Sequence, residues 1–212
     1  MDKTNINFLK PFGPVIAKVT IPKKLIDKLN EYCDATISDE KKSAEQDHGG
    51  KLVGNVTKEI RLEDDFITKC GWLEFLGRVT KQYVEFGTME KKVTKFNLIN
   101  SWIVSQFKNE YNPTHWHGGH VSGAGYLKVP KNLGKPFQES KKTNYNGCLQ
   151  LVHGSKQFLS PSLYHIEPKI GDFYLFPNYL MHTVYPFTDT DEERRCVSFN
   201  AFVNEEVYNV YS

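Results

Sequence analysis

Three of the seven histidines fall within six residues, in the segment Tyr111-Asn-Pro-Thr-His115-Trp-His117-Gly-Gly-His120. Side chains two residues apart in a β-strand point to the same face, so His115 and His117 would project together. Two such imidazoles can bind one first-row metal ion, and imidazoles without thiolates suit iron, zinc, copper or nickel. The helical pattern His-Glu-x-x-His is absent and no cysteine lies close by, which argues against a structural zinc site.

A fourth histidine with a suitable context lies further along the chain. The run Pro168-Lys-Ile-Gly-Asp-Phe-Tyr-Leu-Phe-Pro-Asn-Tyr-Leu-Met-His182 begins with a turn that launches a strand, and Phe-Pro ends that strand shortly before His182. Arg194 and Arg195 follow and open another apolar strand. A buried arginine on an inward strand can bind a carboxylate through two hydrogen bonds. Beside the acidic run 191–193, either arginine is equally compatible with a surface charge.

The composition is that of one soluble globular domain over residues 1–212. Lys plus Arg number 27 and Asp plus Glu 25, and this balance argues against nucleic acid as an obligatory partner. No apolar window approaches the roughly 20 residues of a membrane span, and the first residues lack a signal-peptide core. The four scattered cysteines, without a Cys-x-x-Cys pair, are typical of reduced thiols. We therefore expect a cytoplasmic protein, of unspecified oligomeric state.

The first ninety residues predict helices and one strand. Residues 12–21 predict a short strand, and Pro22 can occupy the first turn of the helix that follows. Residues 37–58 are polar and contain glycine, which predicts a long surface loop. From Phe66 to Phe86, apolar residues recur every three or four positions, which predicts a second amphipathic helix that Gly87 would end.

After residue 92 the pattern becomes that of β-strands separated by turn residues. The predicted strands are 94–107, 122–129, 148–153, 162–167, 172–176, 180–185 and 195–203. There is no alternation of strands and helices and no glycine-rich dinucleotide or phosphate loop. The fold class is therefore α+β and mainly β, with a C-terminal sandwich or barrel.

These segments together resemble the non-haem iron(II)- and 2-oxoglutarate-dependent oxygenases. The likeness is greatest to their small prolyl-hydroxylase-like branch, known largely from phage and bacterial genomes, and it spans roughly residues 96–203. The opening segment from Phe12 onward is similar to that branch more weakly. The likeness rests on Ser101-Trp102, His115-Trp-His117, Ser122-Gly123 with Tyr126-Leu127, the run 168–182, and Arg194 through Ser198-Phe199-Asn200.

The resemblance implies a double-stranded β-helix, a jelly-roll or cupin-like fold of about eight strands. Residues 93–205 would form this core, and residues 1–92 would supply a strand and supporting helices packed outside. It also implies that His115, His117 and His182 are the catalytic metal ligands and hold Fe(II). Most of the superfamily has a carboxylate where His117 stands, although this branch often has histidine there. His120 is an alternative third ligand, and the i, i+2 spacing favours His117.

The resemblance further implies 2-oxoglutarate and O2 as cosubstrates, with an arginine of the last strand binding the distal carboxylate. Arg194 shares a strand face with polar residues, whereas Arg195 shares one with apolar residues. This parity favours Arg194, with Ser198 or Tyr126 as further contacts, but one β-bulge would exchange the two arginines. The implied reaction hydroxylates a C–H bond of a peptide, protein or small molecule and releases succinate and CO2.

Two other interpretations fit parts of the pattern. A cupin-like three-histidine enzyme would not use 2-oxoglutarate, but no glutamate follows the histidine pair within four residues and such an enzyme does not require the arginine. A non-catalytic β-sandwich binding module would leave the histidines incidental. The loops 37–58 and 131–146 are natural lids over a pocket. Aromatic residues that could line such a pocket are Trp102, Trp116, Tyr126, Tyr179 and Tyr185.

Overall fold

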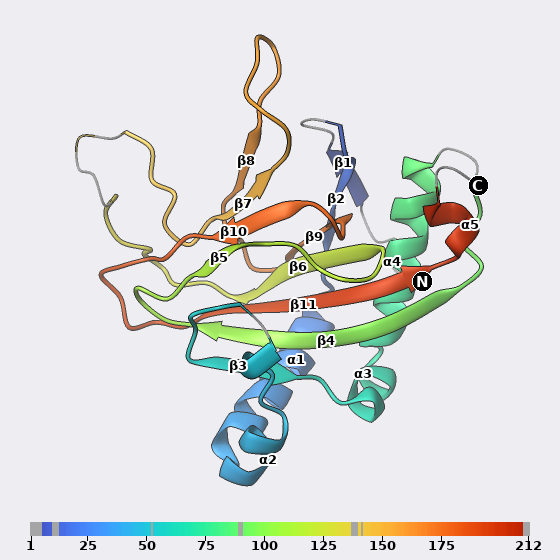
Figure 1. The fold of residues 1–212 in the computed structure, drawn as a ribbon. Helices are drawn as coiled ribbons and strands as arrows, with labels where there is room; N and C mark the ends of the chain where they lie inside the picture. Colours follow the sequence, from blue (N-terminus) through green and yellow to red (C-terminus); the bar gives the residue numbers. More distant parts are fainter. Residues whose placement is uncertain are drawn as a thin grey trace.

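The computed structural model describes residues 6–9, 13–51, 53–88, 91–136, 140 and 142–209, and these form two antiparallel sheets (Figure 1). The larger sheet has seven strands in the order β1-β2-β9-β6-β11-β4-β3. They are β1 Ile6–Leu9, β2 Ile16–Thr20, β9 Asp172–Pro177, β6 Val121–Lys128, β11 Arg194–Val203, β4 Phe96–Gln106 and β3 Lys58–Arg61. The smaller sheet runs β5 Asn112–His115, β10 Met181–Val184, β7 Leu149–Val152 and β8 Leu163–Ile166.

The helices come mainly from the first half of the chain. They are α1 Lys23–Ser38, α2 Glu40–Glu45, the 3-10 helix η1 Gly49–Lys51, α3 Asp64–Cys70, α4 Trp72–Gly87 and the short α5 Glu205–Tyr208. Of these, α1, α3, α4 and α5 pack on the face of the larger sheet away from the smaller one (Figure 1). Within the described ranges, no helix is both long and apolar enough to span a membrane.

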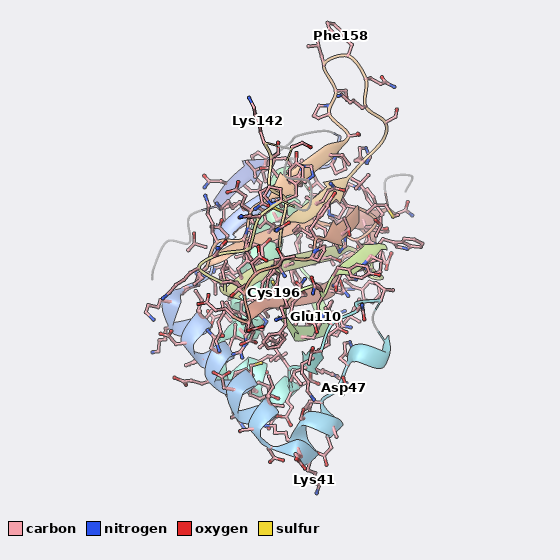
Figure 2. The ribbon with its side chains drawn as sticks, turned by 90° about the vertical axis from the view of Figure 1, so that its left-hand side faces the viewer. Lys41, Asp47, Glu110, Lys142, Phe158 and Cys196 are labelled. Atoms are coloured by element: carbon pink, nitrogen blue, oxygen red, sulfur yellow. The ribbon has the colours of Figure 1, made fainter. Side chains whose placement is uncertain are left out.

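Alternation along the strands of the larger sheet separates two cores. On β11, Val197 and Phe199 point to the helices and pack in one cluster with Trp72 of α4. Cys196 points to the opposite face and packs with Tyr126 in the space between the two sheets. Figure 2 shows Cys196 deep inside the molecule. The same parity decides which residues of β11 can reach a site between the sheets.

The seven strands predicted after residue 92 are all present as β4 and β6–β11, which confirms the mainly β interpretation. The helix predicted over 66–86 is two helices, because Gly71 adopts a left-handed conformation at φ 91° and breaks it. Of the strand predicted over 12–21, residues 16–20 form β2, and Phe12 lies outside the described residues.

The long surface loop predicted over 37–58 is wrong for much of its length. Asp39 caps α2 by accepting a hydrogen bond from the amide of Lys42, so a polar segment becomes helical. The segment then continues through η1 into the edge strand β3. Polarity alone suggested a loop, because α2 exposes four of its six residues and carries little apolar periodicity.

Candidate metal centre and its cavity

Strand pairing in the smaller sheet brings two of the predicted ligands together. His115 ends β5 and His182 lies in β10, and the two residues are direct partners in the antiparallel register. Directly opposed residues have Cβ atoms about 5 Å apart. Their imidazole rings lie 4.2 Å apart between centroids, with His182 buried and His115 half-buried. Residues far apart in the sequence thus converge through one strand pair.

His117 reaches the same point by a different route from the one its spacing suggested. It lies beyond the end of β5, not in the strand, so the i, i+2 argument does not position it. Instead its amide donates to the carbonyl of Asn178 at 3.0 Å, and the Asn178 side-chain amide donates to the His117 carbonyl at 3.1 Å. These two hydrogen bonds to the segment before β10 hold the His117 ring with its centroid 4.9 Å from those of His115 and His182.

The donor atoms of these histidines fit a single metal ion. One ring nitrogen from each lies within 4.8 Å of the others, and the Nε2 atoms of His117 and His182 are 3.1 Å apart. Nitrogens bound to one ion at about 2.1 Å and at right angles lie about 3 Å apart. Nδ1 of His115 donates to the Pro113 carbonyl, and Nδ1 of His182 to the Leu180 carbonyl, so both Nε2 lone pairs remain available.

The protein environment keeps the three rings neutral. Burial, reinforced by the neighbouring histidines, lowers the pKa of His182 to about 3. Burial and the nearby His115 lower the pKa of His117 to about 4, and burial lowers that of His115 as well. A metal binds the neutral form of imidazole, so the site needs no proton release at neutral pH.

His120, the alternative third ligand, lies elsewhere. Its Nδ1 accepts a hydrogen bond from the amide of Val203, and its ring stacks on Tyr208 with centroids 3.9 Å apart. Nε2 lies 3.5 Å from a carboxylate oxygen of Glu205. His120 is thus a buried histidine that ties α5 to the sheet, and it does not belong to the cluster of three.

The three histidines line a cavity of about 320 Å³ between the two sheets. The larger sheet contributes the even-numbered residues of β4 and β11, as alternation requires. Those residues are Asn100, Trp102, Val104 and Gln106 of β4, and Arg194, Cys196, Ser198 and Asn200 of β11. Phe176 and Leu149 provide apolar walls, and the Phe176 ring lies 5.0 Å from that of His182.

Arg194 points into this cavity and is 2% exposed. Its Nη1 donates to Oε1 of Gln106 at 2.8 Å, its guanidinium lies over the Tyr126 ring at 5.1 Å, and its Nε has no partner among the described residues. Within that part of the chain no carboxylate lies within 4.0 Å of it. A buried guanidinium without a carboxylate is a ready site for an anion.

Arg195 points the opposite way. Its guanidinium donates to Asp34 of α1 at 2.6 Å, to Glu193 at 2.6 and 2.8 Å, and to Asn30 at 3.2 Å. These contacts pin α1 to β11 on the helix side of the sheet, outside the cavity. Because alternate residues of a strand point to opposite faces and no bulge lies between the two arginines, Arg194 faces the cavity and Arg195 faces the helices.

Of the other residues predicted to line the pocket, some line the cavity and others do not. The Tyr126 hydroxyl is buried in the cavity wall and has no hydrogen-bond partner among the described residues, and half-buried Ser198 also lines the cavity. Trp102 and Trp116 line it too, with Trp116 64% exposed at its rim. Tyr179 and Tyr185 are not among the lining residues.

Sequence reasoning named the segment 37–58 as a lid over a pocket but identified none of the individual residues on this side of the cavity. His48 and Val53 come from the segment 37–58 predicted as a surface loop, Glu59 comes from β3 directly after it, and Asn100 and Gln106 come from β4. The β4 pair could have been found by applying to residues 100–106 the parity rule that separated the two arginines. Glu59 carried no such signal, because β3 itself was not predicted.

Comparison with known proteins agrees with this geometry. Residues 100–200 match the family model described as "Putative 2OG-Fe(II) oxygenase". No curated protein matches the chain. Among solved structures, a prolyl-4-hydroxylase from Pseudomonas putida is similar with a TM-score of 0.54 and 12% identity, over 93% of both chains.

Two further solved structures are similar. The viral collagen prolyl hydroxylase of Paramecium Bursaria Chlorella virus-1, solved with 2-oxoglutarate, has a TM-score of 0.54 and 15% identity over 88% of this chain and 94% of its own. HygX from Streptomyces hygroscopicus, solved with nickel, 2-oxoglutarate and hygromycin B, has a TM-score of 0.50 and 12% identity over 87% and 81%. At these identities the likeness shows the fold, which is the expected double-stranded β-helix.

The family match runs from within β4 to within β11, the part of the chain that carries the three histidines and Arg194. It favours an oxygenase over the two other interpretations, a cupin-like enzyme that does not use 2-oxoglutarate and a non-catalytic module. Residues 100–200 of the chain thus match the model of the iron(II)- and 2-oxoglutarate-dependent oxygenases, and the fold is similar to that of solved prolyl hydroxylases.

Proposed function

We propose that the chain hydroxylates a C–H bond of a peptide, protein or small-molecule substrate. In this proposal His115, His117 and His182 hold iron(II), and Arg194 binds 2-oxoglutarate. The observation that carries it is one cavity lined by three converging neutral imidazoles and a buried guanidinium without a carboxylate among the described residues. Together these two features match a cation and a dianion.

The bound iron(II) supplies the oxidative chemistry, in which O2 and 2-oxoglutarate yield succinate, CO2 and an oxygen atom for the substrate. The chain supplies the positions. The Pro113 and Leu180 carbonyls fix the tautomers of His115 and His182, and the Asn178 contacts hold His117. Because all three ligands are neutral, they offset none of the cation's charge, which favours an anionic cosubstrate beside it.

Arg194 and Tyr126 are suited to bind the distal carboxylate of 2-oxoglutarate. The unpartnered Nε of Arg194 and the unpartnered Tyr126 hydroxyl both lie in the cavity wall, and the two side chains are in contact. Gln106 holds the guanidinium from the other side, which fixes its plane before the ligand arrives. Half-buried Ser198 is a further polar neighbour along the same strand face.

The remaining walls exclude water from this end of the cavity. Phe176 packs against the His182 ring, and Leu149 and Cys196 close the space between the sheets. A dry wall strengthens charge interactions with the cosubstrate and limits side reactions. The exposed Trp116 at the rim is placed to contact a substrate as it enters.

The test is succinate formation from 2-oxoglutarate by purified protein with and without Fe(II), in air and under nitrogen. We expect succinate only when Fe(II) and O2 are both present, and its loss in His182→Ala. The control is His120→Ala, which removes a buried histidine outside the cluster and should retain the activity. Succinate release independent of iron, or no binding of 2-oxoglutarate, contradicts the proposal.

A further inference from the structure

The cavity contains a second buried charge that the proposed cofactor chemistry does not use. Glu59 of β3 is 2% exposed and lines the cavity. Among the described residues, neither of its carboxylate oxygens has a hydrogen-bond partner. Burying an ionised group without a partner is costly, so such a group is a strong indication of a missing ligand.

The strand register places Glu59 away from the predicted 2-oxoglutarate site. Glu59 is paired with Val104 of β4, and β4 separates β3 from β11, which carries Arg194. Neighbouring strands lie about 4.8 Å apart, so the backbones of β3 and β11 are roughly 10 Å apart. Within the described part of the chain, Glu59 forms no ion pair with Arg194 or with any other cation. The cavity thus has a basic side and an acidic side.

The acidic side presents the Glu59 carboxylate. Asn100 also lines the cavity, but it lies four residues along β4 from Val104, the partner of Glu59, and so belongs to another part of the wall. Burial and the nearby Asp47 raise the pKa of Glu59 to about 7, so no neighbouring cation stabilises its charge. His48 lines the same side, and its ring lies 5.9 Å from Trp102.

The chain packs closely behind the carboxylate. A Cβ atom added at Gly54 would lie 3.1 Å from Oε1 of Glu59 and 2.6 Å from the side-chain oxygen of Asn112. A Cβ atom added at Gly49 would lie 3.6 Å from Oε2. The backbone therefore covers Glu59 on its outer side at two glycines, and the cavity is where a ligand can meet it.

We infer that the substrate carries a protonated nitrogen, as an amine or a guanidinium, and that Glu59 binds this group. This inference rests on the proposed function, because it assigns Arg194 and the three histidines to 2-oxoglutarate and iron. A cation beside Glu59 would replace the missing partner with a charge-assisted hydrogen bond. A proline ring within a peptide has no N–H and would leave the carboxylate unpaired.

The size of the cavity narrows the substrate further. At about 320 Å³ it lies at the small end for a ligand pocket, and 2-oxoglutarate takes part of that space. What remains suits one slender chain, such as a lysine or arginine side chain or a small free amine. Both sources present the same cationic group, so the experiment includes each of them.

The experiment measures binding to the holoenzyme, loaded with Fe(II) and 2-oxoglutarate under nitrogen, by isothermal titration calorimetry. The cationic probes are Nα-acetyl-lysine amide, Nα-acetyl-arginine amide and the small amine n-butylamine. Their uncharged counterparts are Nα-acetyl-norleucine amide, Nα-acetyl-citrulline amide and 1-butanol. We expect at least one cationic probe to bind about thirtyfold more tightly than its counterpart, because losing one partner of a buried charge pair typically costs that much.

Two matched variants identify the residue responsible. Glu59→Gln removes the charge with little change of shape and should bring each pair of probes to within about threefold. Asp47→Asn makes the same change of net charge at an exposed residue near Glu59 and should keep the preference. A preference for the n-butylamine pair alone indicates a small free amine, and a preference for the blocked amino acids indicates a side chain.

Three results would overturn the inference: no cationic probe binds, the uncharged counterparts bind equally well, or Glu59→Gln keeps the preference. Each variant is also titrated with 2-oxoglutarate alone, which should bind as it does to the wild type. That titration separates the two hypotheses, since a protein that binds 2-oxoglutarate but no cation contradicts only this inference. A protein that binds no 2-oxoglutarate contradicts the proposed function itself.

Discussion

Arg194 and Arg195 are adjacent, equally buried and opposite in surroundings. Each is 2% exposed, yet Arg195 has Asp34 and Glu193 beside it, whereas Arg194 has only the neutral Gln106 and Tyr126 among its described contacts. A guanidinium already paired with carboxylates stabilises the fold, and one without them can bind a ligand. Local partners, not burial, therefore distinguish a structural arginine from a binding one.

This contrast predicts different effects of the two substitutions. Arg194→Gln should weaken 2-oxoglutarate binding by about thirtyfold or more, since it removes the charge that faces the cavity. Arg195→Gln should leave that affinity within about threefold and lower the free energy of unfolding by about 2 kcal/mol, since it breaks the contacts to α1. Calorimetric titration with 2-oxoglutarate and urea unfolding measure the two effects. Equal losses of affinity would contradict the assignment.

At the scale of elements, the smaller sheet and the segment before β10 form the histidine cluster together. Pairing of β5 with β10 brings His115 to His182, and Asn178 fixes His117 beyond the strand end. Sequence spacing pointed to His115 and His117, and the resemblance to the oxygenases added His182, which lies in one of the strands that turn signals and apolar runs predicted. Spacing could not show the contact between Asn178 and His117, since that bond joins two irregular segments with no periodicity to reveal it.

The hydrogen bond from the Asn178 side chain to the His117 carbonyl predicts that its removal lowers the metal affinity. Asn178→Ala removes the side-chain hydrogen bond to the His117 carbonyl and should weaken binding of Fe(II) about tenfold, the usual scale for a contact that orients a ligand. Tyr208→Phe is the matched control, because the Tyr208 hydroxyl makes the other contact of that side chain, to Asn178 Oδ1 at 3.4 Å. Anaerobic titration with Fe(II) gives both affinities. An unchanged affinity in Asn178→Ala would show that backbone contacts alone position His117.

The half of the site that sequence reasoning missed lies at the edge of the larger sheet. Arg194, Ser198 and Tyr126 belong to long strands whose alternation can be followed by eye. Glu59 belongs to a four-residue edge strand, which follows the largely exposed helix α2 and the short 3-10 helix η1. The position of a short edge strand depends on the strand with which it pairs, here β4. The residues of the edge strand itself therefore carry little signal that predicts it.

For the whole molecule, the buried Glu59 predicts how stability depends on pH. Its folded-state pKa is raised from 4.5 to about 7, so ionisation destabilises the folded protein. The favourable contribution is complete below about pH 4.5 and is lost as the pH rises through about 7, a change of about 3 kcal/mol. Asp47 and His48 are the titratable neighbours on this side.

Urea unfolding of metal-free wild type and Glu59→Gln at about pH 5 and about pH 8 isolates this contribution. The two proteins should differ little at the lower pH, and the variant should be the more stable at the higher pH. Other titrating groups, the three histidines included, are common to both proteins and cancel in the difference. A constant difference across this range would mean that Glu59 keeps an ordinary pKa in the folded protein.

One face of strand β11 lines the cavity and the other packs against the helices, and this limits which insertions and deletions the strand can accept. Gaining or losing a single codon near its start would turn every following side chain over, which would send the ligand-binding guanidinium toward α1 and a helix-facing phenylalanine toward the metal. A point substitution in this strand therefore affects one face at a time, whereas a change in its length affects both. The loop of residues 153–162 between β7 and β8, whose tip carries the exposed Phe158 (Figure 2), is free of that constraint and can vary in length.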